Sequence, residues 1–173
     1  MKKLLIVLLT GFLLSACQQE QRYTQQSAEI DSVKSLFKLY NSGDFDGQKA
    51  FYADTAKLFY NVPESKPSTI DQIITIQKEE IAPFSAYSIE FTDDAVEMVL
   101  TDKGETWVNL WGVWKATLAG TDQSFEIPVH STFQFVNGKI VKEFGYWDNS
   151  SVAMAFMELE AAEKAASDTT ASN

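Results

Sequence analysis

The sequence predicts an α+β domain in which a strongly curved antiparallel sheet forms a cone-shaped barrel around three N-terminal helices, followed by a C-terminal helix. Two observations predict this class. Apolar residues recur at helical spacing up to about residue 81, and from residue 86 the pattern changes to strands separated by turn residues. Long strands must bend to pack against short helices, so we expect the sheet to enclose a cavity for a small molecule.

The first residues of the chain have the composition of an export signal. Two lysines precede an apolar run, Leu4 to Leu14, that is too short to span a membrane as a helix. Ser15, Ala16 and Cys17 follow, and the whole arrangement resembles the signal of bacterial lipoproteins. The resemblance implies that residues 1–16 are a signal peptide and that Cys17 is acylated. The alternative is an ordinary secretory signal with a chance cysteine.

Charge and sorting signals indicate where the protein acts. Gln18 and Gln19 follow Cys17, and by the sorting rules of lipoproteins the absence of an aspartate there implies the periplasmic face of the outer membrane. The net charge is −10 and the only arginine is Arg22, so the chain lacks the clustered basic residues that bind nucleic acid. We therefore expect the lipid on Cys17, rather than basic side chains, to attach the protein to the membrane.

Residues 17–27 are predicted to form a flexible, lipidated tether, because residues 18–27 are polar and lack apolar periodicity. The folded domain is expected over residues 28–165. Residues 166–173 are small and polar, and we expect them to form a disordered tail.

Three helices are expected before residue 82, and the boundaries follow from capping residues and prolines. They are a helix capped by Ser27 and ending at Gly43, a shorter helix from Asp44 to about Ala53, and a third from Thr69 to about Ile81. A short strand over residues 57–61 separates the second helix from the third. The C-terminal helix is expected from Ser150 to about Ala165.

Five further strands are expected, over residues 87–91, 95–100, 106–118, 124–136 and 139–147. Turn sequences separate them, and Asn137-Gly138 is typical of a tight hairpin because both residues tolerate positive φ. The strand over residues 106–118 carries tryptophans and aliphatic residues on both faces, so both faces should be covered.

Four short segments together resemble one superfamily. They are Asn41-Ser42-Gly43-Asp44, the run Phe51 to Ala56, the run Phe135 to Ile140, and Tyr146-Trp147-Asp148. Their order and spacing resemble the nuclear transport factor 2-like superfamily, which includes ketosteroid isomerases and SnoaL-type polyketide cyclases, over roughly Glu29 to Phe156. The resemblance implies the cone fold. It also implies that a second copy of the chain covers the outer face of the sheet in a homodimer; the alternative is that the tryptophans of residues 106–118 fill a bulky core of a monomer.

Departures from the superfamily pattern narrow the chemistry. Where ketosteroid isomerases place their oxyanion-stabilising tyrosine and their general base, this chain has Leu36 and Tyr60. A leucine donates no hydrogen bond and a phenol is a poor base at neutral pH, so the isomerase mechanism is not expected. The arginine of limonene epoxide hydrolases also has no counterpart within the domain.

Asp148 and His130 are the candidate catalytic residues. In the polyketide cyclases, an aspartate placed like Asp148 resembles a general acid–base group, and alternation along the strand puts Asp148 on the face of Phe144 and Tyr146. If this face points inward, Asp148 lies at the mouth of the cavity; its alternative role is to cap the C-terminal helix. His130 is the only histidine, and it is either a proton shuttle or a hydrogen-bonded strand residue.

Tyr60, Tyr146 and Trp111 are the candidate ligand-binding residues. No metal site and no cofactor are expected, because a single histidine and a single cysteine offer too few ligands. The first functional hypothesis is a lipoprotein that binds a small apolar ligand or a protein partner. The alternative is a cyclase, dehydratase or isomerase that uses Asp148 and His130, and a third is an envelope interaction module whose acidic surface meets a basic partner.

Overall fold

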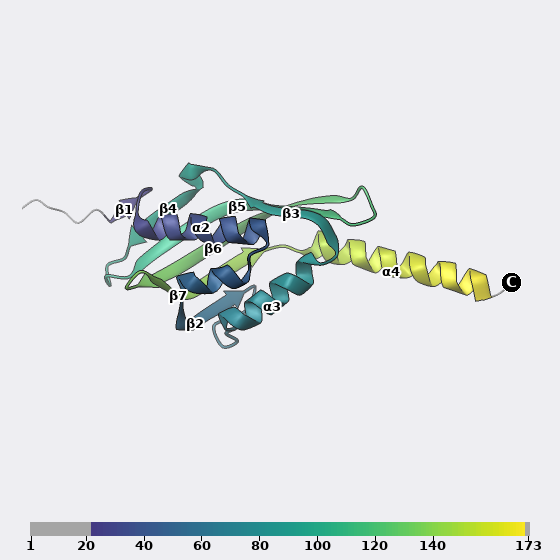
Figure 1. The fold of residues 1–173 in the computed structure, drawn as a ribbon, viewed down its shortest axis with the longest axis horizontal. Helices are drawn as coiled ribbons and strands as arrows, with labels where there is room; N and C mark the ends of the chain where they lie inside the picture. Colours follow the sequence, from purple (N-terminus) through teal and green to yellow (C-terminus); the bar gives the residue numbers. More distant parts are fainter. Residues whose placement is uncertain (1–21, 172–173) are drawn as a thin grey trace, which may run out of the picture.

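A curved sheet with helices on one face forms the centre of the structure (Figure 1). The computed structural model describes residues 22–171. The sheet has seven strands in the order β1-β4-β5-β6-β7-β2, with β3 also paired to β5. The strands are β1 Tyr23–Thr24, β2 Tyr52–Tyr60, β3 Phe84–Glu90, β4 Val96–Leu100, β5 Thr106–Leu118, β6 Ser124–Val136 and β7 Lys139–Trp147.

The predicted α+β class and the curved sheet are confirmed, with one correction to strand direction. β2 runs parallel to β7, whereas every other pair of neighbouring strands is antiparallel. The sheet is therefore mixed and open rather than an antiparallel barrel. Hairpin turns dictate antiparallel neighbours only for strands that follow one another in the sequence, and β2 and β7 are distant in the sequence.

The long meander β5-β6-β7 has the bounds that its turns predict. Asn137 and Gly138 between β6 and β7 have φ of 52° and 74°, the left-handed conformation that a two-residue hairpin requires. β5 and β6 pair without interruption from Thr106 opposite Phe135 to Thr117 opposite Ser124.

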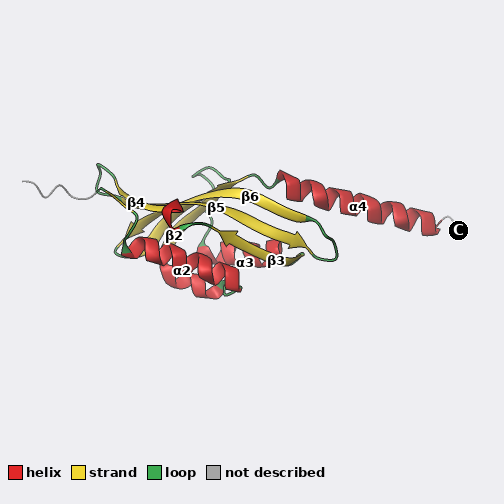
Figure 2. Cartoon of the chain, turned by 90° about the horizontal axis from the view of Figure 1, so that it is seen from above, coloured by secondary structure: helices red, strands yellow, loops and turns green. Residues whose placement is uncertain are grey.

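The helices α2 (Ala28–Ser42) and α3 (Ile70–Ile81) lie on the same side of the sheet (Figure 2). Ser27 caps α2, and Gly43 ends it with φ of 77°. Thr69 and Gln72 form a reciprocal capping box at the start of α3. The predicted helix over residues 44–53 is shorter, a 3-10 helix η1 (Asp46–Phe51), because the chain enters β2 already at Tyr52.

The end of the predicted tether belongs to the sheet. Tyr23 pairs with Val99 of β4, and the N–H of Leu100 donates to the carbonyl of Arg22 at 2.8 Å. The guanidinium of Arg22 also forms an ion pair of 2.6 Å with Asp102. Strand pairing uses backbone groups, so a polar segment can join a sheet without apolar periodicity. A second 3-10 helix, η2 (Asp93–Ala95), precedes β4.

The C-terminal helix α4 (Ser150–Ala171) is longer than predicted and projects from the domain (Figure 1). Its first turns pack Val152, Ala155 and Phe156 against β3, β5 and β6. Residues 166–171, expected to be disordered, continue the helix. Within the described range, no helix is both long enough and apolar enough to cross a membrane.

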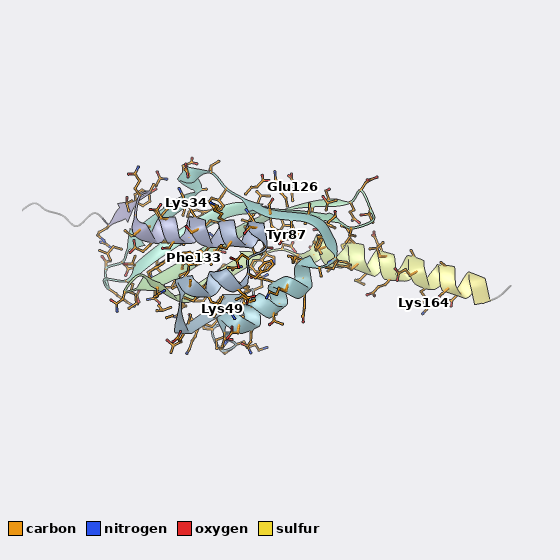
Figure 3. All side chains as sticks on the ribbon, viewed as in Figure 1. Lys34, Lys49, Tyr87, Glu126, Phe133 and Lys164 are labelled. Atoms are coloured by element: carbon orange, nitrogen blue, oxygen red, sulfur yellow. The ribbon has the colours of Figure 1, made fainter. Side chains whose placement is uncertain are left out.

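The main core fills the end of the sheet nearest β1. Ile30 and Val33 of α2 pack there with Val108 and Leu110 of β5, and these four residues are at most 1% exposed. Phe133 of β6 is also fully buried in this core (Figure 3). Toward α4 the packing opens, and this is where the cavity lies.

Candidate functional site

A cavity of about 540 Å³ opens between the inner face of the sheet and the helices α2, α3 and α4. Its walls are mostly apolar and aromatic, and they include Tyr40 of α2, Trp114 of β5 and Trp147 of β7. A volume between about 300 and 1,000 Å³ with a predominantly apolar lining is typical of small-molecule sites. The cavity expected from sheet curvature is therefore present.

Glu143 is the polar centre of this cavity. It lies on β7, is only 3% exposed, and accepts one hydrogen bond at each carboxylate oxygen. The hydroxyl of Tyr52 donates to Oε2 at 2.5 Å, and the hydroxyl of Tyr60 donates to Oε1 at 2.9 Å. Both tyrosines come from β2, so the parallel pairing of β2 with β7 assembles the group.

Gly145 makes room for this arrangement. A Cβ atom built on Gly145 would lie 2.6 Å from the ring of Trp147 and 2.9 Å from that of Tyr60. These two rings pack edge to face, with centroids 5.3 Å apart. Glycine at this position therefore allows the Tyr60 ring to lie close to β7, where its hydroxyl reaches Glu143.

Burial raises the pKa values of Glu143, Tyr52 and Tyr60. It raises the pKa of Glu143 from 4.5 to about 7, although the hydrogen bonds from Tyr52 and Tyr60 oppose the shift. Burial, reinforced by the nearby charge of Glu143, raises the pKa of both tyrosines well above 10. Glu143 therefore exchanges its proton near neutral pH, while the phenols keep theirs.

Other polar groups line the cavity farther from Glu143. The indole N–H of Trp114 donates to the hydroxyl of Tyr40 at 3.1 Å, and burial raises the pKa of Tyr40 to about 12. Gln48 donates to Gln77 at 3.3 Å. Glu80 lies at the mouth of the cavity, and partial burial raises the pKa of its carboxyl group.

Of the predicted ligand-binding residues, Tyr60 lines the cavity, whereas Trp111 and Tyr146 lie on the outer face of the sheet. They form a row with His130, because Trp111 pairs with His130 and His130 pairs with Tyr146 across neighbouring strands. The rings of Trp111 and His130 stack with centroids 4.9 Å apart, and Nδ1 of His130 lies 3.0 Å from the carbonyl oxygen of Leu110.

Asp148 lies just beyond β7 at the start of α4, outside the cavity lining. Its Oδ1 accepts a hydrogen bond of 2.9 Å from the N–H of Ser150, and hydrogen bonding with Ser150 lowers the pKa of the carboxyl group. This is a turn closed by a side chain, directly before the helix; the carbonyl of Asn149 accepts the first hydrogen bond of α4, from the N–H of Ala153 at 3.0 Å, so Asn149 rather than Asp148 stands at the cap position. The structure therefore does not bring Asp148 and His130 together in one cavity.

The inward face of β7 is the one opposite to the face that carries Asp148. Glu143 and Trp147 line the cavity, while Tyr146 is 48% exposed on the other side. Glu143 was missed because alternation separates the two faces of a strand without saying which faces inward. A signal was available, since Glu143 is the one charged residue in the alternating set Val141, Glu143, Gly145 and Trp147.

Two further expectations concern metal binding and lipidation. Across residues 22–171, no group of three or more His, Cys, Asp or Glu side chains is placed to hold a metal ion. Cys17, the expected lipidation site, lies outside the described residues.

Comparisons with known proteins agree with this architecture. Many solved structures share the fold, among them PrhC, AclR and IdmH. PrhC from Penicillium brasilianum aligns with a TM-score of 0.63 and 14% identity over 83% of this chain and 94% of that one. AclR, a proposed hydroxylase from Streptomyces galilaeus, aligns with a TM-score of 0.61 and 14% identity over 75% and 96%. IdmH, a proposed polyketide cyclase from Streptomyces antibioticus, aligns with a TM-score of 0.57 and 20% identity over 70% and 93%. No curated protein matches the sequence. A family model for the SnoaL-like domain matches residues 33–143, and the chain therefore belongs to the SnoaL-like domain family.

Proposed function

We propose that the domain binds a small, largely apolar molecule in the cavity and that Glu143 holds the polar end of that molecule. The observation that carries the proposal is a carboxyl group with 3% exposure, fixed by two tyrosine hydroxyls, on the wall of an apolar cavity of about 540 Å³. Such convergence of a few polar groups in an apolar pocket gives a ligand one preferred orientation.

A second candidate function is acid–base catalysis of the cyclase, dehydratase or isomerase kind. It is favoured by the pKa of Glu143, which burial raises to about 7, because proton transfer is most efficient when the pKa of the group lies near the working pH. IdmH, a proposed polyketide cyclase, shares the fold. In this candidate Glu143 takes the acid–base role that the sequence suggests for Asp148 and His130, since neither of those residues lines the cavity.

One experiment tests the binding proposal. Native mass spectrometry of the purified protein identifies co-purifying small molecules, and their rebinding is followed by the fluorescence of Trp114 and Trp147, which both line the cavity. We expect Trp114→Phe and Trp147→Phe to remove most of the fluorescence change, whereas Trp111→Phe on the outer face retains it. A change that depends on Trp111 instead contradicts the proposed site.

A second measurement separates binding from catalysis. The recovered molecule is incubated with the protein in D2O and its mass is followed with time. Conversion, or exchange of carbon-bound hydrogen for deuterium, that disappears in Glu143→Gln supports catalysis. An unchanged molecule that binds more weakly to Glu143→Gln supports binding alone.

We further propose that Cys17 is lipidated and holds the domain at the periplasmic face of the outer membrane. Arg22 is already tied to the edge of the sheet, so five residue steps separate the anchor from the fold, a reach of at most about 18 Å. Residues of α4 line the cavity, and α4 and β1 lie at opposite ends of the domain (Figure 1), so the cavity lies toward the end away from the anchor. Labelled palmitate should enter the wild-type protein in a bacterial host and not Cys17→Ala; equal labelling of both contradicts the assignment.

The homodimer implied by the superfamily resemblance is also our proposal. It is supported by the outer face of the sheet, where Trp111 and Tyr146 are 46% and 48% exposed beside His130. Large aromatic side chains in such a row are typical of protein interfaces rather than of a solvated surface.

A further inference from the structure

The cavity is lined by acidic side chains and by no basic ones among the described residues. Three glutamates line it, with Glu143 inside and Glu79 and Glu80 toward the mouth. Among the described residues, no lysine, arginine or histidine contributes to the lining. A carboxylate, sulfate or phosphate on a ligand would therefore enter a site of like charge without a positively charged partner among the lining residues.

Three lysines of the surrounding elements form ion pairs on the outside of the cavity. Lys49 of η1 and Lys78 of α3 form ion pairs of 2.7 and 2.8 Å with Asp71 and Asp46, and Lys34 of α2 pairs with Asp93. Figure 3 shows Lys34 and Lys49 on the elements that surround the core. By contrast, the carboxylate of Glu80 has no hydrogen-bond or ion-pair partner within residues 22–171.

Glu143 can only accept hydrogen bonds from a ligand while it is ionised. A carboxylate offers about four acceptor positions, and Tyr52 and Tyr60 occupy one on each oxygen. Because the hydroxyl group of each tyrosine already donates its hydrogen bond to Glu143, neither hydroxyl can donate to a carbonyl group of the ligand. A group that approaches the ionised form of Glu143 must therefore be a donor.

Aromatic faces complete the environment. Tyr40, Tyr60, Trp114 and Trp147 line the same cavity, and the faces of tyrosine and tryptophan rings attract cations, most strongly where water is excluded. A protonated amine satisfies the donor requirement, the charge of Glu143 and the aromatic surfaces together, and its hydrogen bond to a carboxylate is charge-assisted. A neutral alcohol can donate a hydrogen bond, but it carries no positive charge to attract Glu143 or the aromatic faces.

From these contacts we infer that the ligand of the cavity is a hydrophobic amine that binds as its cation, with the ammonium group at Glu143 and the hydrocarbon against the apolar walls. This inference rests on the proposed binding function and names the chemical class of the ligand.

Three probes with the same hydrocarbon cage test the inference: 1-aminoadamantane, 1-adamantanol and adamantane-1-carboxylate. Their binding to the purified protein is measured by calorimetry and tryptophan fluorescence at pH 8, where Glu143 is largely ionised. We expect the amine to bind more tightly than the alcohol by about tenfold or more, as a charge-assisted contact in a dry site allows. We expect no binding of the carboxylate. Glu143→Gln, an isosteric change, should reduce the preference for the amine to near unity.

The pH dependence of amine binding to the wild-type protein tests the same inference without relying on a variant that could fail to fold. The aminoadamantane cation keeps its charge between pH 5 and 8, so its affinity should fall as the pH drops through the titration of Glu143. The titratable groups that share the cavity are Tyr40, Tyr52 and Tyr60, which stay protonated over this range, and Glu79 and Glu80 at the mouth. Glu80→Gln therefore serves as the matched control and should keep the pH dependence.

The outcomes separate the inference from the proposed function. An alcohol that binds as tightly as the amine, or a carboxylate that binds, overturns the amine assignment and leaves small-molecule binding in place. An amine affinity that does not change between pH 5 and 8 also overturns it. If none of the three probes binds, both the inference and the binding function are contradicted.

Discussion

The hydroxyl of Tyr60 donates a hydrogen bond of 2.9 Å to Glu143 across the parallel pair β2 and β7. The two residues belong to strands that are distant in the sequence, and the contact places a carboxyl group where water is largely excluded. The ionisation of Glu143, and with it the behaviour of the cavity, therefore depends on the register of this strand pair.

Glu143→Gln should remove a pH dependence of stability. The carboxyl group titrates near 4.5 when unfolded and near 7 in the folded protein, so between these values the unfolded state binds fewer protons and stability falls as pH rises. The difference amounts to about 3 kcal/mol for a buried group with this shift. Urea unfolding from pH 4 to 8 should show wild type losing stability relative to Glu143→Gln as pH rises. A difference that stays constant over this range contradicts the raised pKa.

Tyr60→Phe should raise the pKa of Glu143 further. The Tyr60 hydroxyl hydrogen-bonds the ionised carboxylate and lowers the pKa, so its removal disfavours ionisation. The shift is measured by NMR titration of the side-chain carboxyl carbon in glutamate-labelled protein. Tyr146→Phe, on the outer sheet face, is the matched control and should leave the titration unchanged. A downward shift in Tyr60→Phe would show that the hydrogen bond is not formed as described.

Gly145→Ala should reproduce part of the Tyr60→Phe effect. The new methyl group would lie 2.6 Å from the Trp147 ring and 2.9 Å from the Tyr60 ring, so at least one ring must move. Overpacking of this kind costs roughly 1–3 kcal/mol of stability. Thermal unfolding and the NMR titration of Glu143 together check the prediction. Unchanged stability with an unchanged titration would show that Tyr60 does not need the space.

Asp148→Asn should leave ligand binding and any turnover unchanged, because Asp148 lies outside the cavity and its side chain closes the turn before α4. Asparagine closes such turns as aspartate does, so this variant should also keep its melting temperature, whereas Asp148→Ala should melt lower. Binding titrations and thermal melts of both variants provide the test. Loss of activity in Asp148→Asn would instead support the catalytic role suggested by the sequence.

Trp111→Glu should convert the proposed dimer into a monomer. The side chain is 46% exposed on the outer sheet face, so the fold itself does not require it, but a buried charge at an interface disfavours association. Sedimentation velocity of the wild type and the variant distinguishes the two states. Met157→Glu, at a side chain of α4 that is 68% exposed, is the control and should remain dimeric. A monomeric wild-type protein contradicts the dimer proposal.

Local chemistry explains why some elements could be predicted closely. The strands β5, β6 and β7 have the predicted bounds because Asn137-Gly138 and the other turn residues fix where each hairpin reverses. Ser27 and Gly43 fix the ends of α2 in the same way. β2 was predicted too short, because Tyr52 pairs with Ile140 of the distant strand β7 and the pairing resumes only at Lys57 after a register shift, a relationship that no local signal in the sequence marks.

The sequence by itself determined the helix caps, the hairpins and the curved α+β architecture, because these depend on residues close to one another in the chain. Only the tertiary structure decided which face of β7 lines the cavity, and hence that Glu143 rather than Asp148 lies inside it. Alternation divides a strand into two faces, but the choice between them is made by packing against β2 and the helices, which are distant in sequence.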